Sequence, residues 1–113
     1  MNVYQKAMEF GEIVYNQIKR FPKIEDYRLS SQFARAADLI AFNIAEGSGG
    51  SDASFLNYLR IARNSSRECV SASTKAYRRN YISFDEYEIN RGYLVEINKM
   101  LSSLMKYIKS KDN

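Results

Sequence analysis

Apolar side chains recur every three or four residues along most of the chain, as they do on one face of an α-helix. The pattern predicts four helices, which cover about residues 3–20, 29–46, 52–79 and 84–109. Every predicted helix is amphipathic, and short connections join each helix to the next. Four such helices pack as an antiparallel up-down-up-down bundle. The predicted fold class is therefore all-α, with residues 1–113 in a single domain.

Residues that begin or end helices lie at the predicted boundaries. Pro22 disfavours helix in the residue before it and so ends the first helix. Ser30 is a suitable N-cap for the second helix, and Gly47 is a suitable left-handed residue at its other end. We expect Ser51 to cap the third helix and Ser83 to begin a capping box for the fourth. The boundaries therefore rest on capping chemistry as well as on periodicity.

The third helix has a predicted core face whose second half is small and partly polar. Small residues let two helix backbones approach closely, and a buried hydroxyl can donate to a carbonyl of the preceding turn. We therefore expect tight packing along this face, with a ligand cavity as the alternative. The face consists of Phe55, Leu59, Ala62, Ser66, Cys69, Ser73 and Ala76.

The formal net charge of +4 resides entirely on the third helix. Residues 52–79 hold six basic and two acidic side chains, whereas the rest of the chain holds eleven of each. A basic stripe of this kind can contact phosphates and release their counterions; a plain solvated face is the alternative. Aromatic residues do not alternate with the arginines, so we expect contacts to a nucleic-acid backbone with little sequence readout. The basic face has Arg60, Arg67 and Arg78 opposite the core, with Arg63, Lys75 and Arg79 beside them.

The first and fourth helices carry more apolar surface than the core of a bundle requires. Aromatic and methionine side chains on an otherwise polar flank are typical of a subunit interface. We therefore expect the protein to form a homo-oligomer; the alternative is a broad core with tyrosine hydroxyls that reach water. The predicted interface consists of Tyr4, Met8, Tyr15, Ile89, Tyr93, Met100 and Tyr107.

The second helix carries a stripe of polar residues beside its apolar face. Because buried polar groups need hydrogen-bond partners, a partly buried stripe predicts a structural polar network. A functional pocket is the alternative. The predicted network joins Gln32, Arg35, Asn43 and Glu46 to Glu68 of the third helix, with Glu68 as the partner of Arg35.

The composition excludes several kinds of chemistry. The chain has no histidine and one cysteine, Cys69, so a zinc site, a Ser–His–Asp triad, a Cys–His pair and an intramolecular disulfide are all ruled out. The sequence shows no signal peptide, and no apolar run approaches the roughly 20 residues of a membrane span. We therefore expect a cytoplasmic protein without metal, cofactor, membrane contact or catalytic residues.

Several motifs resemble a known family over nearly the whole chain. The similar residues are Phe21-Pro22, Tyr27, Leu29, Ser31-Gln32, Arg35-Ala36-Ala37, Ile40, Asn43-Ile44-Ala45-Glu46-Gly47, Phe55, Leu59, Ile61-Ala62, Ser65, Glu68 and Met100-Leu101. Together they resemble the four-helix bundle proteins encoded in intervening sequences of bacterial 23S ribosomal RNA genes. The chain departs from the family pattern where Ala34-Arg35 replaces a pair of arginines, and where leucines around Cys69 are missing.

The resemblance implies a homopentamer without enzymatic activity. It also implies kinship with the accessory protein of diversity-generating retroelements, a basic pentamer that binds nucleic acid and a reverse transcriptase. Residues and resemblance together predict a non-enzymatic oligomeric bundle that binds RNA or DNA through the basic face of the third helix. The alternative is a protein–protein adaptor whose partner contacts the polar face of the second helix or the assembled ring.

Overall fold

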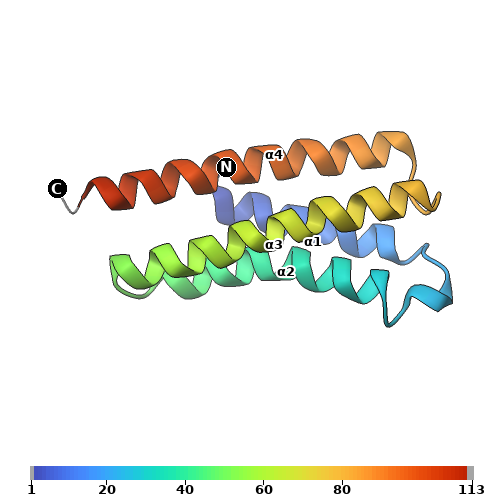
Figure 1. Cartoon of the computed structure of the whole chain (residues 1–113), viewed down its shortest axis with the longest axis horizontal. Coiled ribbons are helices and arrows are strands. Elements are labelled where there is room, and N and C mark those ends of the chain that lie inside the picture. Colours follow the sequence, from blue (N-terminus) through green and yellow to red (C-terminus); the bar gives the residue numbers. More distant parts are fainter. Residues whose placement is uncertain (1, 112–113) are drawn as a thin grey trace.

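The four predicted helices form, and each runs opposite to the one before it (Figure 1). The structure is a computed structural model that describes residues 2–111. Its elements in chain order are α1 (Val3–Ile18), the 3-10 turn η1 (Lys23–Glu25), α2 (Leu29–Ser48), α3 (Asp52–Arg78) and α4 (Phe84–Ser110). The predicted helix bounds fall within two residues of these, and the all-α four-helix bundle is confirmed.

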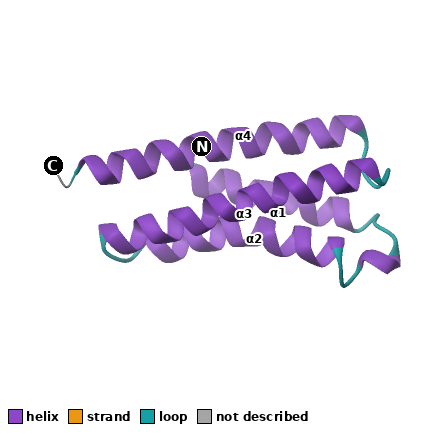
Figure 2. Cartoon of the chain, in the orientation of Figure 1, coloured by secondary structure: helices purple, strands orange, loops and turns teal. Residues whose placement is uncertain are grey.

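The helices form an elongated bundle of about 50 × 24 × 20 Å around one core. The α2–α3 hairpin packs most extensively, α1 contacts α2 and α4, and α1 lies diagonally across from α3. With 16 residues, α1 is much shorter than α3 and α4, which have 27 each. The C-terminal part of α4 therefore extends beyond the start of α1 (Figure 2).

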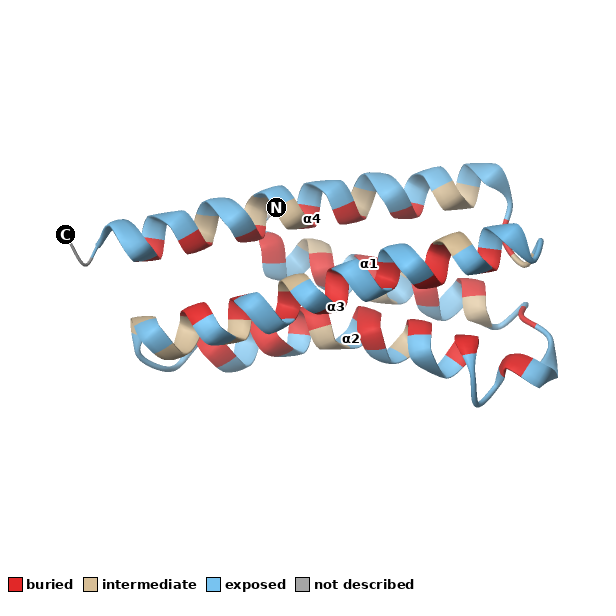
Figure 3. Cartoon of the chain, viewed as in Figure 1, coloured by how far each residue is buried: buried red, intermediate tan, exposed pale blue. Residues whose placement is uncertain are grey.

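Buried residues line the inward faces of all four helices (Figure 3). The predicted core face of α3 is buried except for Phe55, which is half-buried and packs against the core. Ser66 and Ser73 do not donate back to their own helix; their hydroxyls accept hydrogen bonds from Asn98 (2.9 Å) and Asn90 (3.0 Å) of α4. The small polar half of α3 is thus buried and hydrogen-bonded to α4.

The prediction that Gly47 ends α2 in the left-handed conformation is wrong. The helix continues to Ser48, and none of the described glycines has a positive φ. A Cβ on Gly47 would lie 2.6 Å from Cβ of Tyr58 and 2.9 Å from Cδ1 of Phe55. A glycine is required there because α3 passes too close to α2 for any side chain.

The left-handed cap lies at the end of α3 instead. Asn80 has φ 63°, the Tyr81 amide donates to the Ala76 carbonyl (2.9 Å), and the Asn80 amide donates to the Tyr77 carbonyl (3.0 Å). This is a Schellman motif, and asparagine tolerates its left-handed residue better than most side chains. It turns the chain sharply from α3 toward α4.

Two predicted caps are confirmed and one is wrong. Ser51 accepts from the Ser54 amide, and Ser83 forms the full capping box at the start of α4. Ser30, by contrast, is buried inside the first turn of α2, and its hydroxyl has no partner among the described residues. The Leu29 amide donates instead to the Glu25 carboxylate of η1 (3.4 Å). The start of α2 is therefore tied to η1.

Candidate nucleic-acid interface

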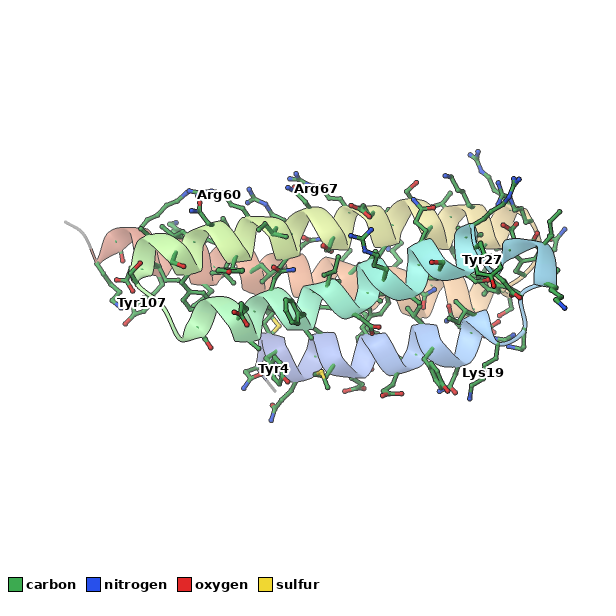
Figure 4. The ribbon with its side chains drawn as sticks, turned by 90° about the horizontal axis from the view of Figure 1, so that it is seen from below. Tyr4, Lys19, Tyr27, Arg60, Arg67 and Tyr107 are labelled. Carbon is green, nitrogen blue, oxygen red and sulfur yellow. The ribbon has the colours of Figure 1, made fainter. Side chains whose placement is uncertain are left out.

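The arginines of α3 form a line along its solvent-facing side. Arg60 and Arg67 are two turns apart, which is about 10 Å along the axis, and Arg78 follows three turns later. All three are exposed, and Figure 4 shows Arg60 and Arg67 projecting from the same edge of the bundle. The structure thus places these charges on one accessible face.

Most charges of this basic face are not neutralised. Arg60 and Arg67 donate to the amide oxygens of Asn57 (3.0 Å) and Asn64 (3.4 Å), which carry no charge. Within residues 2–111, the four ion pairs are Arg20–Glu86, Arg79–Glu25, Arg91–Glu88 and Lys111–Asp52. Arg60, Arg63, Arg67, Lys75 and Arg78 therefore have no carboxylate within 4.0 Å in that part of the chain.

Two members of the predicted basic face differ from the others. Arg63 is only half-exposed, and its Nε is shielded from solvent without a partner among the described residues. Arg79 is paired with the buried carboxylate of Glu25 (3.0 Å). Arg79, predicted to bind nucleic acid, is thus also the counter-ion of Glu25.

Glu25 joins three parts of the fold, and the sequence analysis missed it. Its carboxylate accepts hydrogen bonds from the Tyr81 hydroxyl (2.8 Å), Arg79 (3.0 Å) and the Leu29 amide (3.4 Å). The Tyr81 hydrogen bond, assisted by Leu29 and Arg79, holds the pKa of Glu25 below its usual range. The carboxylate therefore remains charged and ties η1 to α2 and to the end of α3. Its position in a polar connection gave no periodic signal.

The predicted polar network on α2 does not form. Gln32, Arg35 and Glu68 border one depression of about 100 Å³, but within residues 2–111 no ion pair joins Arg35 to Glu68 within 4.0 Å. Glu46 is exposed, and the buried Asn43 donates to the Leu39 carbonyl of its own helix (2.7 Å). Gln32, Arg35 and Glu46 face solvent, where water hydrates them and they need no protein partner.

A buried polar network exists elsewhere, between α1, α3 and α4. Gln17 and Asn90 each donate to the other at 2.9 Å, and Asn90 also donates to Ser73. The sequence does hold a signal for it, because Asn90 occupies a core position of α4 between Tyr87 and Leu94. A polar residue inside an apolar stripe requires a buried partner.

The predicted oligomer interface separates into an exposed and a packed set. Tyr4, Met8 and Tyr15 are exposed and border a groove of about 600 Å³ between α1 and α2, which also includes the exposed Phe42. The groove is mostly apolar but contains Asp38, whose pKa is raised by burial and by the charge of Glu12. Phe42 was not predicted at an interface, because it lies off the core face of α2.

The four predicted interface residues of α4 do not behave alike. Ile89 and Tyr107 are exposed, and Figure 4 shows Tyr107 near the far end of the helix. Tyr93 stacks on Phe10 and donates to Glu9, and Met100 is half-buried against the core. Tyr93 and Met100 therefore pack within the protomer, because α1 covers this part of α4.

Cys69, the single cysteine of the chain, is buried. Burial raises the pKa of the Cys69 thiol, and the charges of Glu68 and Asp38 raise it further. Within residues 2–111, no three Cys, Asp or Glu side chains are grouped to hold a metal ion. In the same part of the chain, none of the helices is long and apolar enough to cross a bilayer.

Known proteins share both the sequence pattern and the fold. A family model described as 23S rRNA-intervening sequence protein matches residues 1–103. The chain belongs to this family. A crystal structure at 1.70 Å resolution, of a protein with unknown function from the S23 ribosomal protein family of Bacteroides thetaiotaomicron VPI-5482, has 31% sequence identity and a TM-score of 0.85. The similarity covers 92% of this chain and 98% of that one. No curated protein matches the chain.

Membership in the 23S rRNA-intervening sequence protein family confirms the resemblance inferred from the motifs. The solved S23 structure confirms the bundle independently. Kinship with the accessory protein of diversity-generating retroelements stays a prediction. Function therefore has to be argued from the surface of this chain.

Proposed function

We propose that the protein is a non-enzymatic, oligomeric helical bundle that binds nucleic acid through the basic face of α3. The observation that carries this proposal is the line of Arg60, Arg67 and Arg78, exposed and without a carboxylate within 4.0 Å in the described part of the chain. A nucleic-acid backbone is a repeating row of negative charges, and cations that neutralise it release counterions. The line of arginines extends about 27 Å, long enough to follow several phosphates.

The proposed binding reads shape and charge more than sequence. The side chains between the arginines on the exposed side of α3 are small or polar, and α3 is a straight rod on the outside of the bundle. Phosphate contacts from such a rod position a protein without reading bases. We therefore expect similar affinities for duplexes of different sequence.

Oligomerisation would strengthen binding, because each copy would add its own basic face to the same particle. The exposed apolar groove between α1 and α2 supports association of copies, since burial of Tyr4, Met8 and Phe42 would remove apolar surface from water. The resemblance implies five copies in a ring. Five copies would gather about twenty net positive charges, and a field of that size attracts polyanions.

Fluorescence anisotropy with labelled duplex DNA and structured RNA over a salt titration tests the proposal. We expect Arg60→Glu with Arg67→Glu to abolish binding that the parent shows at low salt. The matched control is Lys99→Glu with Lys106→Glu, which changes the net charge equally but on the exposed side of α4. Absence of parent binding at low salt, or equal effects of the two double variants, would refute it.

The second candidate is a protein–protein adaptor. Its support is the exposed polar face of α2, where no hydrogen bond or ion pair joins Gln32, Arg35 and Glu46 within the described residues, and the apolar groove between α1 and α2. A specific protein captured by the purified oligomer in high salt, after nuclease treatment, would favour the adaptor. Loss of the captured protein under those conditions would favour nucleic acid.

A further inference from the structure

The basic face of α3 opens at its C-terminal end into a groove of about 450 Å³. Three cations line it: Lys75 lies in α3, Arg79 is the C-cap residue of α3, and Arg28 directly precedes α2. Arg28 is distant from the other two in sequence, so only the fold brings the three together. The groove is lined by Ile24, Glu25, Arg28, Leu29, Gln32, Lys75, Arg79 and Tyr81.

The groove keeps a positive charge despite the carboxylate at its floor. Glu25 is 5% exposed, and its hydrogen bonds to Tyr81, Arg79 and Leu29 occupy its oxygens. The charge of Glu25 therefore neutralises one cation of the groove, Arg79. Arg28 and Lys75 are exposed and have no carboxylate within 4.0 Å in the described part of the chain. Such a groove attracts an anion, and phosphate fits the fork of an arginine beside a lysine.

An exposed aromatic residue lies next in sequence to Arg28 of this groove. Tyr27 is 97% exposed and directly precedes Arg28, and Ile24, which lines the groove, is 71% exposed. Figure 4 shows Tyr27 at the end of the bundle where α3 finishes, opposite the end that carries Tyr107. Both faces of the ring are accessible to a ligand. The end of the basic face therefore has an aromatic residue near it after all, supplied by the turn between η1 and α2 and not by α3.

We propose that this end of the bundle binds an unpaired nucleotide of a single-stranded nucleic acid, with a phosphate held between Arg28 and Lys75 and the base stacked on Tyr27. A cationic groove beside an exposed aromatic ring is the arrangement with which proteins hold single strands. A blunt duplex cannot use it fully, because its bases already stack on one another. The inference rests on the proposed function and adds the class of strand.

The chain contains no tryptophan, so one introduced tryptophan reports on one site. The test uses Tyr27→Trp, with Tyr107→Trp at the opposite end as the matched control. Each protein is titrated with labelled oligo(dT), oligo(U) and a blunt duplex at low salt. Anisotropy of the label measures binding, and tryptophan emission measures stacking of a base on the introduced ring.

We expect both single strands to quench Trp emission in the Tyr27→Trp protein but not in the Tyr107→Trp protein. Tyr27→Ala should weaken single-strand binding about tenfold, the effect of losing one base–aromatic stack, and leave duplex binding unchanged. Arg28→Glu with Lys75→Glu should weaken it further. Tyr27 is outside the core, and Arg28 and Lys75 are exposed, so we expect these variants to retain the fold.

Binding seen by anisotropy without quenching in Tyr27→Trp would overturn this inference and leave the proposed function intact. Equal quenching by duplex and single strand would also overturn it. Absence of binding by every nucleic acid at low salt would refute both. Single-strand binding could also be lost in Arg60→Glu with Arg67→Glu while Tyr27→Ala binds like the parent. That result would assign binding to the arginine line alone and overturn the inference.

Discussion

Gln17 and Asn90 exchange two side-chain hydrogen bonds of 2.9 Å across the buried face between α1 and α4. Asn90 also donates to Ser73 of α3, so one amide joins three helices at one level of the bundle. Among neighbouring helices, α1 and α4 pack least extensively. A satisfied polar pair there specifies how far the short α1 is shifted along the long α4, because any other shift would leave two amides unpaired.

Replacement of Asn90 by alanine should be costly. We expect Asn90→Ala to lower the free energy of unfolding by about 2 kcal/mol, because the buried amide of Gln17 loses its partner. Urea unfolding followed by circular dichroism measures this. The control is Ser102→Ala, which is exposed on the same helix. Equal losses in the two variants would show that the amide pair contributes nothing.

Two helical glycines should respond in opposite directions to the same substitution. Gly47→Ala places a Cβ 2.6 Å from Tyr58, and we expect a loss of about 2 kcal/mol from the forced separation of α2 and α3. Gly92→Ala meets nothing within 4 Å and should gain up to about 1 kcal/mol of helix propensity. Thermal unfolding of both proteins checks this, and a neutral Gly47→Ala would contradict the close approach.

Stability should fall in acid because of Glu25. Its pKa is lowered in the folded protein, so the unfolded chain takes up a proton at a higher pH than the folded protein does. The stability that Glu25 contributes is present above the usual carboxyl pKa of about 4.3 and is lost as the pH falls through the lowered value. We expect the free energy of unfolding to decline less steeply in Glu25→Gln than in the parent below about pH 5.

The control for this acid dependence is Glu96→Gln. Glu96 is exposed and has no ion pair within 4.0 Å among the described residues. Its substitution should leave the steepness of the parent curve unchanged. If the free energy of unfolding falls equally steeply with decreasing pH in the parent and in Glu25→Gln, the acid dependence does not come from Glu25.

Salt dependence should report phosphate contacts on α3. Each contact adds about one to the slope of log affinity against log salt concentration. We therefore expect Arg60→Gln with Arg67→Gln to reduce the slope by about two for duplex DNA. An unchanged slope with weakened binding would mean that these arginines act on the fold and not on phosphates.

Association of copies should depend on the groove between α1 and α2. We expect Met8→Glu with Phe42→Glu to lower the mass of the particle in light scattering, because two buried charges would lie in the interface. Val70→Glu, on α3, is the control of similar exposure. A parent that is already a monomer would refute oligomerisation. Identical masses for the parent and the groove variant would show that the subunit interface does not include this groove.

Much of the fold was predictable because helices are specified locally. The three-to-four spacing of apolar residues predicted all four helices, and Ser51 and Ser83 predicted two of their starts. The same local argument failed for Ser30 and Gly47. Their roles depend on what lies beside α2: η1 caps its start, and α3 crowds its end.

The sequence by itself determined the helices, their inward faces, the concentration of charge on α3 and the membership of a family. Only the tertiary structure decided which polar groups bond, Gln17 with Asn90 and Glu25 with Arg79 and Tyr81, and that Arg28 and Lys75 line one groove. Periodicity reports which side of a helix is buried. It carries no information about how far one helix is shifted along the next, and that shift selects the partners of every side chain at an interface.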